Sequence, residues 1–346
     1  MKDIIIADHV IGSEKPPFVI AEMSANHNQS LENAIRIVEE VAKTGADAIK
    51  LQTYTPDTMT LKGALKIQDE NSLWNGRELY DLYKEGSTPW EWHEKIFKRG
   101  RELGLVVFST PFDHTSVDFL EGLNTEVYKI ASFENTDVPL LRKVASTGKP
   151  VIMSTGTADL GDLHQAVAEL RTHGCKDLVL LKCTSTYPAD PSECHIRTIP
   201  HMRSLFGCHV GLSDHTKGIG VPVASVALGA VVVEKHVTLS RADGGIDSAF
   251  SLEPAELKSL VDECQRAYAS LGRVNYDITS GEEKSMIFKR SIFLVNDLKK
   301  GEMINEKDIR VLRPGIGLSP RFYDLVVGKA LKQDVKAGTP LSLEMI

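Results

Sequence analysis

The stretch His209-Val-Gly-Leu-Ser-Asp-His215 is an apolar run with a polar end, and Ala230-Val-Val-Val-Glu-Lys-His236 repeats that pattern one unit later. Each run has the composition of a buried β-strand, and the Gly/Ala-rich stretch between them is long enough for one helix. A strand–helix–strand unit of this kind brings both strand ends to the same edge of a parallel sheet. We therefore expect His215 and His236 to meet at one rim, where two imidazoles suggest a metal site.

Six further apolar runs precede these two, so that eight expected strands alternate with helical patterns. The expected strands are Phe18–Glu22, Ala48–Gln52, Val106–Thr110, Val127–Ser132, Pro150–Thr155, Leu178–Thr184, His209–Ser213 and Ala230–His236. The expected helices are Ser30–Thr44, Pro89–Leu103, Thr115–Gly122, Val138–Thr147, Leu160–His173, Ile219–Gly229 and Pro254–Leu271. Eight such units over about 270 residues predict a (β/α)₈ TIM barrel, an α/β fold. The alternative is a doubly wound open sheet, which usually has a Gly-rich turn after its first strand; this chain has Met23-Ser-Ala-Asn-His-Asn28 there.

Two regions depart from the alternation. Residues 56–88 are long, polar and aromatic, which predicts a loop insertion on the active rim. After Asn275 the alternation stops, and short β-rich pieces follow at Ser291–Val295, Ile309–Leu312 and Gly328–Ala330. We expect a barrel domain at 1–275, a linker at 276–289 and a small second domain at 290–346.

Composition excludes several classes of function. The net charge of −7 does not indicate a nucleic-acid partner. The five cysteines form no CxxC pair and are odd in number, which fits a reducing cytoplasm better than a disulfide framework. The chain has neither an apolar leader nor an apolar stretch of about 18 residues, so neither export nor a membrane span is expected.

In a barrel, functional groups belong at the carboxyl ends of the strands. Polar or ionisable residues occur at all eight expected ends: Glu22; Lys50 and Gln52; Thr110; Lys129 and Ser132; Ser154; Thr184 and Tyr187; Ser213 and His215; Glu234 and His236. Solvent exposure explains serine and threonine there, but Lys50 and Lys129 are embedded in apolar sequence. Two lysines among hydroxyls predict a phosphate or carboxylate pocket. The stretch Ser154-Thr-Gly-Thr157 adds backbone N–H groups ahead of a helix.

The two strand-end histidines have Asp214 and Glu234 beside them, which favours a metal site over a structural role. Nitrogen and oxygen ligands of this kind suit Mn²⁺, Mg²⁺ or Zn²⁺. His27 is either a third ligand or a residue of a rim loop. Glu22 either pairs with a lysine or acts as an acid/base or an oxygen partner for a cationic intermediate. Asp247 either hydrogen-bonds sugar hydroxyls or forms a turn.

These residues lie in motifs by which the chain resembles the sialic acid synthases, enzymes that condense phosphoenolpyruvate with an amino sugar to make nine-carbon ulosonic acids. The motifs follow one order over nearly the whole chain: Ala21-Glu-Met-Ser-Ala-Asn-His27, Lys50-Leu-Gln-Thr53, Phe108-Ser-Thr-Pro-Phe112, Tyr128-Lys-Ile-Ala-Ser132, Ser154-Thr-Gly156, Tyr187-Pro188, Gly211-Leu-Ser-Asp-His-Thr216 and Glu234-Lys-His236. The segment with Arg313-Pro-Gly315 is similar to the family's antifreeze-like (SAF) domain. Within the family, Lys182-Cys-Thr-Ser-Thr-Tyr-Pro188 and Arg241-Ala-Asp-Gly-Gly-Ile-Asp-Ser-Ala-Phe250 resemble the pseudaminic acid synthase branch.

The resemblance implies a cytoplasmic, domain-swapped homodimer and a role for each rim residue. The implied phosphoenolpyruvate-binding residues are Lys50, Thr110, Lys129, Ser132, Ser154 and Ser213. The implied sugar-binding residues are Gln52, Tyr187, Asp247 and, reaching the partner subunit's site, Arg313. His215 and His236 would ligate Mn²⁺, with Mg²⁺ or Co²⁺ as alternatives, and would polarise the sugar aldehyde through it. Glu22 would stabilise positive charge at C2.

The implied reaction joins C3 of phosphoenolpyruvate to the aldehyde of 2,4-diacetamido-2,4,6-trideoxy-L-altrose, adds water at C2 and releases phosphate by C–O cleavage, giving pseudaminic acid. An N-acetylneuraminate or legionaminic acid synthase would apply the same chemistry to another sugar. A metal-dependent barrel hydrolase or epimerase is a more distant alternative, because it would need more ligands and no pair of lysines. A non-catalytic ice- or carbohydrate-binding role concerns only the C-terminal domain.

Overall fold

The structure is a computed structural model that describes residues 1–68 and 74–346. It divides the chain into two compact units, Met1–Gly272 and Arg273–Ile346. Each unit has a hydrophobic core of its own. No helix among the described residues is both long enough and apolar enough to cross a membrane.

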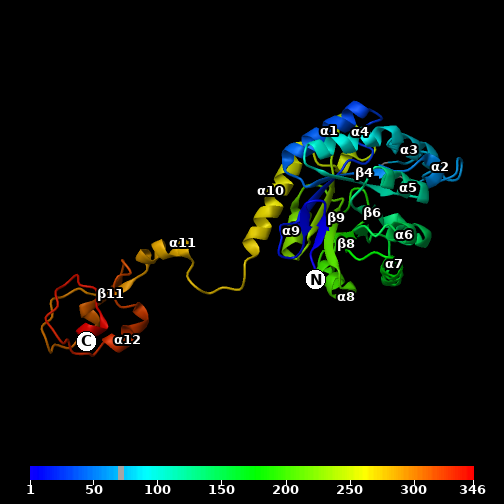
Figure 1. The fold of residues 1–346 in the computed structure, drawn as a ribbon. Helices are drawn as coiled ribbons and strands as arrows, with labels where there is room; N and C mark the ends of the chain where they lie inside the picture. Colours follow the sequence, from blue (N-terminus) through cyan, green and yellow to red (C-terminus); the bar gives the residue numbers. More distant parts are fainter. Residues whose placement is uncertain (69–73) are drawn as a thin grey trace. The chain divides into compact units, whose positions relative to one another are not determined.

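The first unit is a closed barrel of eight parallel strands with helices packed around it (Figure 1). Its strands are β3 (Phe18–Glu22), β4 (Ala48–Thr53), β5 (Val106–Pro111), β6 (Tyr128–Ile130), β7 (Val151–Ser154), β8 (Leu178–Cys183), β9 (His209–Asp214) and β10 (Val232–His236). The predicted TIM barrel is confirmed. The doubly wound alternative is wrong, because β10 pairs with β3 and leaves no open edge.

The helices of this unit follow the strands. They are α1 (Leu31–Thr44), α2 (Pro56–Met59), α3 (Leu79–Gly86), α4 (Trp90–Glu102), α5 (His114–Gly122), α6 (Val138–Ala145), α7 (Leu160–Thr172), α8 (Thr198–Phe206), α9 (Gly220–Ala227) and α10 (Pro254–Leu271). Helix α1 begins where Ser30 accepts a hydrogen bond from the Asn33 N–H, and it ends at Gly45 with a left-handed φ of 81°. Helix α8 was not expected from the sequence, because Pro200 interrupts its pattern, yet its apolar face is buried.

A short hairpin closes the barrel at the end opposite the rim. Strands β1 (Ile4–Ile6) and β2 (His9–Ile11) pair antiparallel and share one hydrophobic cluster with the first residues of the barrel strands. Ile4 and Ile6 are buried while Ile5 is exposed, which is the alternation of a strand with one covered face. The hairpin was not predicted. It leaves the carboxyl ends of the strands as the open end of the barrel.

The predicted loop insertion after β4 contains helical structure. Helices α2 and α3 lie within residues 56–88, whereas residues 69–73 of that prediction lie outside the described part of the chain. The insertion returns to the barrel at α4. Residues of the insertion, such as Leu82 and Tyr83, line a cavity at the carboxyl ends of the barrel strands.

The second unit pairs β11 (Ser291–Leu294) with β12 (Ile309–Leu312), and it also contains α11 (Ser280–Glu283) and α12 (Tyr323–Val326). Its core includes Ile292, Leu294 and Ile304. The strand expected at Gly328–Ala330 is not formed. Only an isolated bridge joins Met303 to Ala330, since Gly328 takes a positive φ of 80° that breaks the extended conformation.

Candidate active site

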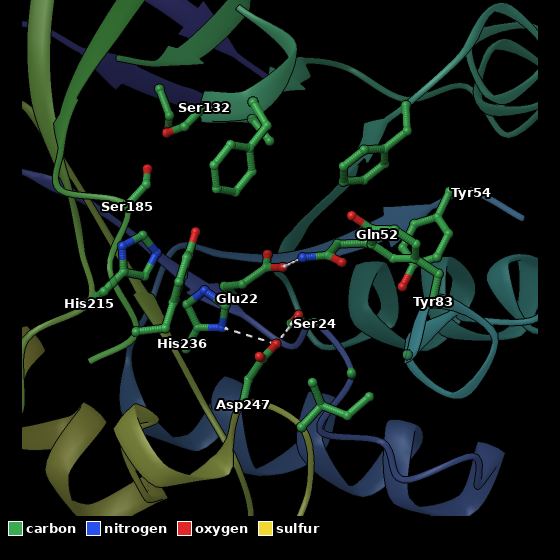
Figure 2. Close-up of a pocket in the computed structure, with 18 of the residues that line it drawn as sticks. Glu22, Ser24, Gln52, Tyr54, Tyr83, Ser132, Ser185, His215, His236 and Asp247 are labelled. Atoms are coloured by element: carbon green, nitrogen blue, oxygen red, sulfur yellow. Dashed lines mark hydrogen bonds and ion pairs between the residues drawn. The ribbon is translucent and has the colours of Figure 1, made fainter. Parts of the chain in front are cut away.

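A cavity of about 450 Å³ lies at the carboxyl ends of the barrel strands. Figure 2 shows side chains from several strands and loops converging on it. The barrel residues to which the family resemblance assigns a role line this cavity, with the exception of Thr110: Glu22, Lys50, Gln52, Lys129, Ser132, Ser154, Tyr187, Ser213, His215, His236 and Asp247. The period of two along each strand explains the convergence, because residues 48, 50 and 52 of β4, for example, point to the same side of the sheet.

Two buried lysines and two buried carboxylates form the floor. The Lys50 ammonium lies 3.0 Å from Glu22 Oε2 and 3.2 Å from Glu234 Oε1. The Lys129 ammonium donates to Ser154 Oγ at 2.7 Å and lies 3.6 Å from Glu234 Oε1. Glu234 therefore lies between two cations.

This arrangement separates the pKa values of the two carboxyls. Burial raises the pKa of Glu22 more than Lys50 lowers it. Burial also acts on Glu234, but Lys129 and Lys50 together outweigh it, so the pKa of Glu234 is lowered and it stays ionised. Burial lowers the pKa of Lys129, whereas the two carboxylates outweigh burial at Lys50 and raise its pKa. An anion that binds at the floor would take over part of the neutralisation of Lys50 and Lys129 that Glu22 and Glu234 now provide.

The predicted histidine pair forms on neighbouring strand ends. The rings of His215 and His236 have centroids 5.3 Å apart. His215 Nδ1 lies 3.0 Å from the Thr184 carbonyl, so donating there leaves Nε2 as a free acceptor. His236 Nδ1 is buried and has no hydrogen-bond partner among the described residues; it lies 3.9 Å from Asp247 Oδ2. Burial and the neighbouring His215 hold the pKa of His236 well below its ordinary value, which keeps it neutral.

These donors fit a divalent metal held by two imidazoles. A neutral ring, and a ring oriented by a backbone carbonyl, are the forms that metal-binding histidines take. Within residues 1–68 and 74–346, no group of three or more His, Cys, Asp and Glu side chains could hold a metal. Side chains of this chain would therefore leave coordination positions for substrate or water.

His27 and Thr110 lie elsewhere than at the cavity surface. His27 is fully buried, with Nε2 3.1 Å from Thr88 Oγ1, while its Nδ1 accepts the Gln29 N–H at 3.1 Å. Both ring nitrogens of His27 have hydrogen-bond partners, which favours the interpretation of His27 as a residue of a rim loop over its interpretation as a third metal ligand. Thr110 accepts a hydrogen bond from the Lys50 ammonium at 3.3 Å. It therefore contacts the lysine rather than the cavity.

The remaining polar side chains are held by one another. Gln52 donates to Glu22 Oε1 at 3.1 Å, and Ser213 donates to Glu234 Oε1 at 3.3 Å. Asp247 accepts from the Ser24 hydroxyl, and burial raises its pKa. Such mutual bonds fix the side-chain positions before substrate arrives.

Glu134 and Cys183 are ionisable lining residues that were not identified from the sequence. Glu134 ends the 3₁₀ turn Ser132–Glu134, and burial raises its pKa to about 7. Cys183 ends β8, where His215 and neighbouring hydroxyls outweigh burial and lower its pKa to about 6. The period of two from Val179 through Leu181 would have placed Cys183 in the cavity.

Comparison with known proteins gives two family matches. Residues 37–276 match the NeuB family, and residues 289–346 match the SAF domain. The pseudaminic acid synthase of Campylobacter jejuni is 42% identical over 330 residues, which cover 95% of this chain and 96% of that protein. The pseudaminic acid synthase of Helicobacter pylori is 40% identical, over 96% of this chain and 98% of that protein.

A solved structure of lower sequence identity shares the fold. The N-acetylneuraminic acid (sialic acid) synthetase of Leptospira borgpetersenii, in complex with citrate, superimposes with a TM-score of 0.74 and 32% sequence identity. The match covers 82% of this chain and 95% of that chain.

Proposed function

This chain belongs to the NeuB family, and from that membership we propose that it condenses phosphoenolpyruvate with 2,4-diacetamido-2,4,6-trideoxy-L-altrose and water to give pseudaminic acid and phosphate. The family resemblance read from the sequence is confirmed, and so is the assignment to the transferases. The observation that carries the proposal is the cavity floor, where two buried lysines lie beside a histidine pair. A hydrolase or epimerase site would not need that pair of lysines.

Phosphoenolpyruvate would bind on the lysine side of the floor. Its phosphate and carboxylate would accept from Lys50 and Lys129, with hydroxyls of Ser132, Ser154 and Ser213 completing the cradle. The 2.7 Å contact between Lys129 and Ser154 supports this, because it holds an ammonium and a hydroxyl side by side as two donors. Hydrogen bonds to charged groups are worth about 1.5–3 kcal/mol each. Thr110 would keep Lys50 in position.

The open-chain sugar would bind on the histidine side. A divalent metal held by His215 and His236, Mn²⁺ first with Mg²⁺ or Co²⁺ as alternatives, would supply Lewis acidity to the aldehyde oxygen. Gln52, Tyr187 and Asp247 would orient the sugar. Tyr187 supports that role through its ring, whose centroid lies 4.4 Å from that of His215.

The bond changes follow from this placement. C3 of phosphoenolpyruvate forms a bond with the aldehyde carbon, and positive charge develops at C2. Glu22 and the ionised Glu234 would stabilise that charge. Water adds at C2, and phosphate leaves with the bridging oxygen as the C–O bond breaks. Holding two reactants in one cavity can contribute about 7–11 kcal/mol at the favourable limit.

The SAF domain would complete the site of a second copy. We propose a domain-swapped homodimer in which Arg313 reaches the sugar in the partner subunit's cavity. Arg313 is exposed and makes no hydrogen bond or ion pair within the described residues, which leaves its guanidinium available. A cytoplasmic location is proposed from the five free, buried cysteines.

Phosphate release from phosphoenolpyruvate, measured with each candidate sugar and Mn²⁺, tests this proposal. We expect release with the diacetamido sugar, and none when sugar is omitted. N-acetylneuraminate synthase is the second candidate, favoured by the likeness to the Leptospira synthetase, and it would show its highest turnover with N-acetylmannosamine. Absence of release with every sugar would overturn both candidates.

A further inference from the structure

The insertion after β4 contributes an apolar surface to the side of the cavity away from the histidines, next to the polar side chains of Gln52 and Glu134. Among the described residues of 54–86, all eight that line the cavity are aromatic, aliphatic or glycine. Charged residues of the same segment, such as Asp57 and Lys84, do not line it. Figure 2 shows Tyr54 and Tyr83 across the cavity from His215 and His236. The insertion after β4 therefore presents an apolar surface to the inside and its charges elsewhere.

Four residues, Tyr54, Leu82, Tyr83 and Phe112, form what we call the aromatic wall. The Tyr54 ring meets the Phe112 ring edge-on at a centroid distance of 5.2 Å and the Tyr83 ring edge-on at 5.8 Å. Gly86 packs behind it, since a Cβ there would stand 2.9 Å from Tyr54 Oη. Tyr54 and Leu82 are buried, whereas Tyr83 and Phe112 are half-buried and line open space. Apart from two phenolic hydroxyls, this wall has no side-chain hydrogen-bonding group.

The chemistry of the floor decides which half of the sugar meets this wall. The aldehyde, C1, must lie at the histidine and lysine floor for carbon–carbon bond formation. Carbons C4 to C6 then extend away from the floor. The two candidate sugars differ in that half, because the diacetamido sugar carries an acetamido group at C4 and a methyl group at C6. N-acetylmannosamine carries hydroxyls at both positions.

We propose that the aromatic wall is a specificity subsite that receives the C4 acetamido methyl and the C6 methyl of the sugar, and so selects a 6-deoxy diacetamido substrate. This inference rests on the proposed function. A hydroxyl placed against the wall would lose its hydrogen bonds to water without full replacement. A single methylene in an apolar pocket is worth about 10–200-fold in kcat/KM, and such a pocket rejects a hydroxylated analogue by about 100-fold.

Substitution of Tyr83 by glutamine tests the subsite, with Tyr83→Phe as the conservative variant and Phe112→Gln as an independent second change. Tyr80→Gln is the matched control, because Tyr80 lies on the same helix, donates to Asp57 Oδ1 at 3.0 Å and does not line the cavity. The measurement is kcat/KM for phosphate release with each sugar at saturating phosphoenolpyruvate, together with the KM for phosphoenolpyruvate.

We expect the preference for the diacetamido sugar over N-acetylmannosamine to fall about tenfold in Tyr83→Gln and Phe112→Gln, from one lost apolar contact. It should stay unchanged in Tyr83→Phe and Tyr80→Gln, and the KM for phosphoenolpyruvate should stay within about twofold, since Lys50 and Lys129 are untouched. Equal losses with both sugars, an unchanged preference, or a wild type without preference would overturn this inference alone. A wild type that releases phosphate with neither sugar would overturn the proposed function and the inference with it.

Discussion

Replacing Lys235 with methionine removes the cation that neutralises a buried carboxylate beside the active site. The Lys235 ammonium pairs with Asp214 and also donates to the Thr216 carbonyl. Lys235 and Asp214 lie opposite each other on β10 and β9, one residue before His236 and His215 respectively. The ion pair therefore joins, on the side away from the cavity, the two strand ends that carry the histidines.

The loss of stability follows from burial. The side chains of Lys235 and Asp214 are 0% and 1% exposed. Removing one partner of such a pair leaves an uncompensated charge and costs about 3–5 kcal/mol. Methionine keeps the length of the aliphatic chain, so the cost is electrostatic rather than a cavity. A domain of this size loses about 2–4 °C of Tm per kcal/mol, so the expected fall is about 10 °C.

Tryptophan fluorescence on heating reports this transition. All three tryptophans, at 74, 90 and 92, lie in the unit Met1–Gly272, so the signal follows the barrel. The control is Lys258→Met, which removes an exposed i,i+4 pair with Asp262 and should cost less than about 0.5 kcal/mol. The double variant Asp214→Asn/Lys235→Met should recover most of the lost stability. The reasoning is refuted if Lys235→Met is no worse than Lys258→Met, or if the double variant is no better than Lys235→Met.

Three further predictions address acid stability, strand packing and substrate binding. His27 and His93 are fully buried, and burial lowers the pKa of each to about 4, so the unfolded chain binds more protons than the folded chain between pH 6.5 and 4. As the pH falls through that window, the free energy of unfolding should decrease by roughly 3 kcal/mol per histidine. A free energy of unfolding in urea that does not change with pH would contradict this. Gly211→Ala should lower the free energy of unfolding by about 1–3 kcal/mol, because a Cβ at this position would stand 2.3 Å from a backbone oxygen of β10. Gly122→Ala is the control and should cost little, because a Cβ there would have no neighbouring atom within 4 Å. Lys129→Met should raise the KM for phosphoenolpyruvate about 10–100-fold and leave the KM for the sugar within about twofold. An unchanged KM for phosphoenolpyruvate would show that Lys129 does not bind this substrate.

The barrel and most of its rim could be predicted because the signals are local. A strand buried on both faces is a continuous apolar run, and an ionisable residue at its end, such as Lys50 or Lys129, has few structural reasons to be there. The period of two then assigns each end to one face. The closed barrel confirms this reasoning for the fold, and the cavity brings the predicted residues together.

The features that were missed depend on distant parts of the chain. The three-residue strands of the hairpin Ile4–Ile11 are too short to show periodicity, and only the barrel beneath explains their burial. The partnership of Asp214 with Lys235 depends on the register between two strands. The aromatic wall joins Leu82 and Tyr83 of the insertion to Tyr54 and Phe112, which follow β4 and β5. No spacing within residues 56–88 indicates which side chains of the insertion face the cavity.

Phosphoenolpyruvate labelled with ¹⁸O in the C2–O–P bridge gives the most direct test of the central claim. The holoenzyme would be incubated with this substrate, Mn²⁺ and the diacetamido sugar, and the released phosphate and the nonulosonic acid analysed by mass spectrometry. Condensation with C–O cleavage predicts that the phosphate keeps the bridging label and that the sugar acid carries none at C2. Unlabelled phosphate, label retained in the sugar acid, or phosphate released without a new nine-carbon product would contradict the account.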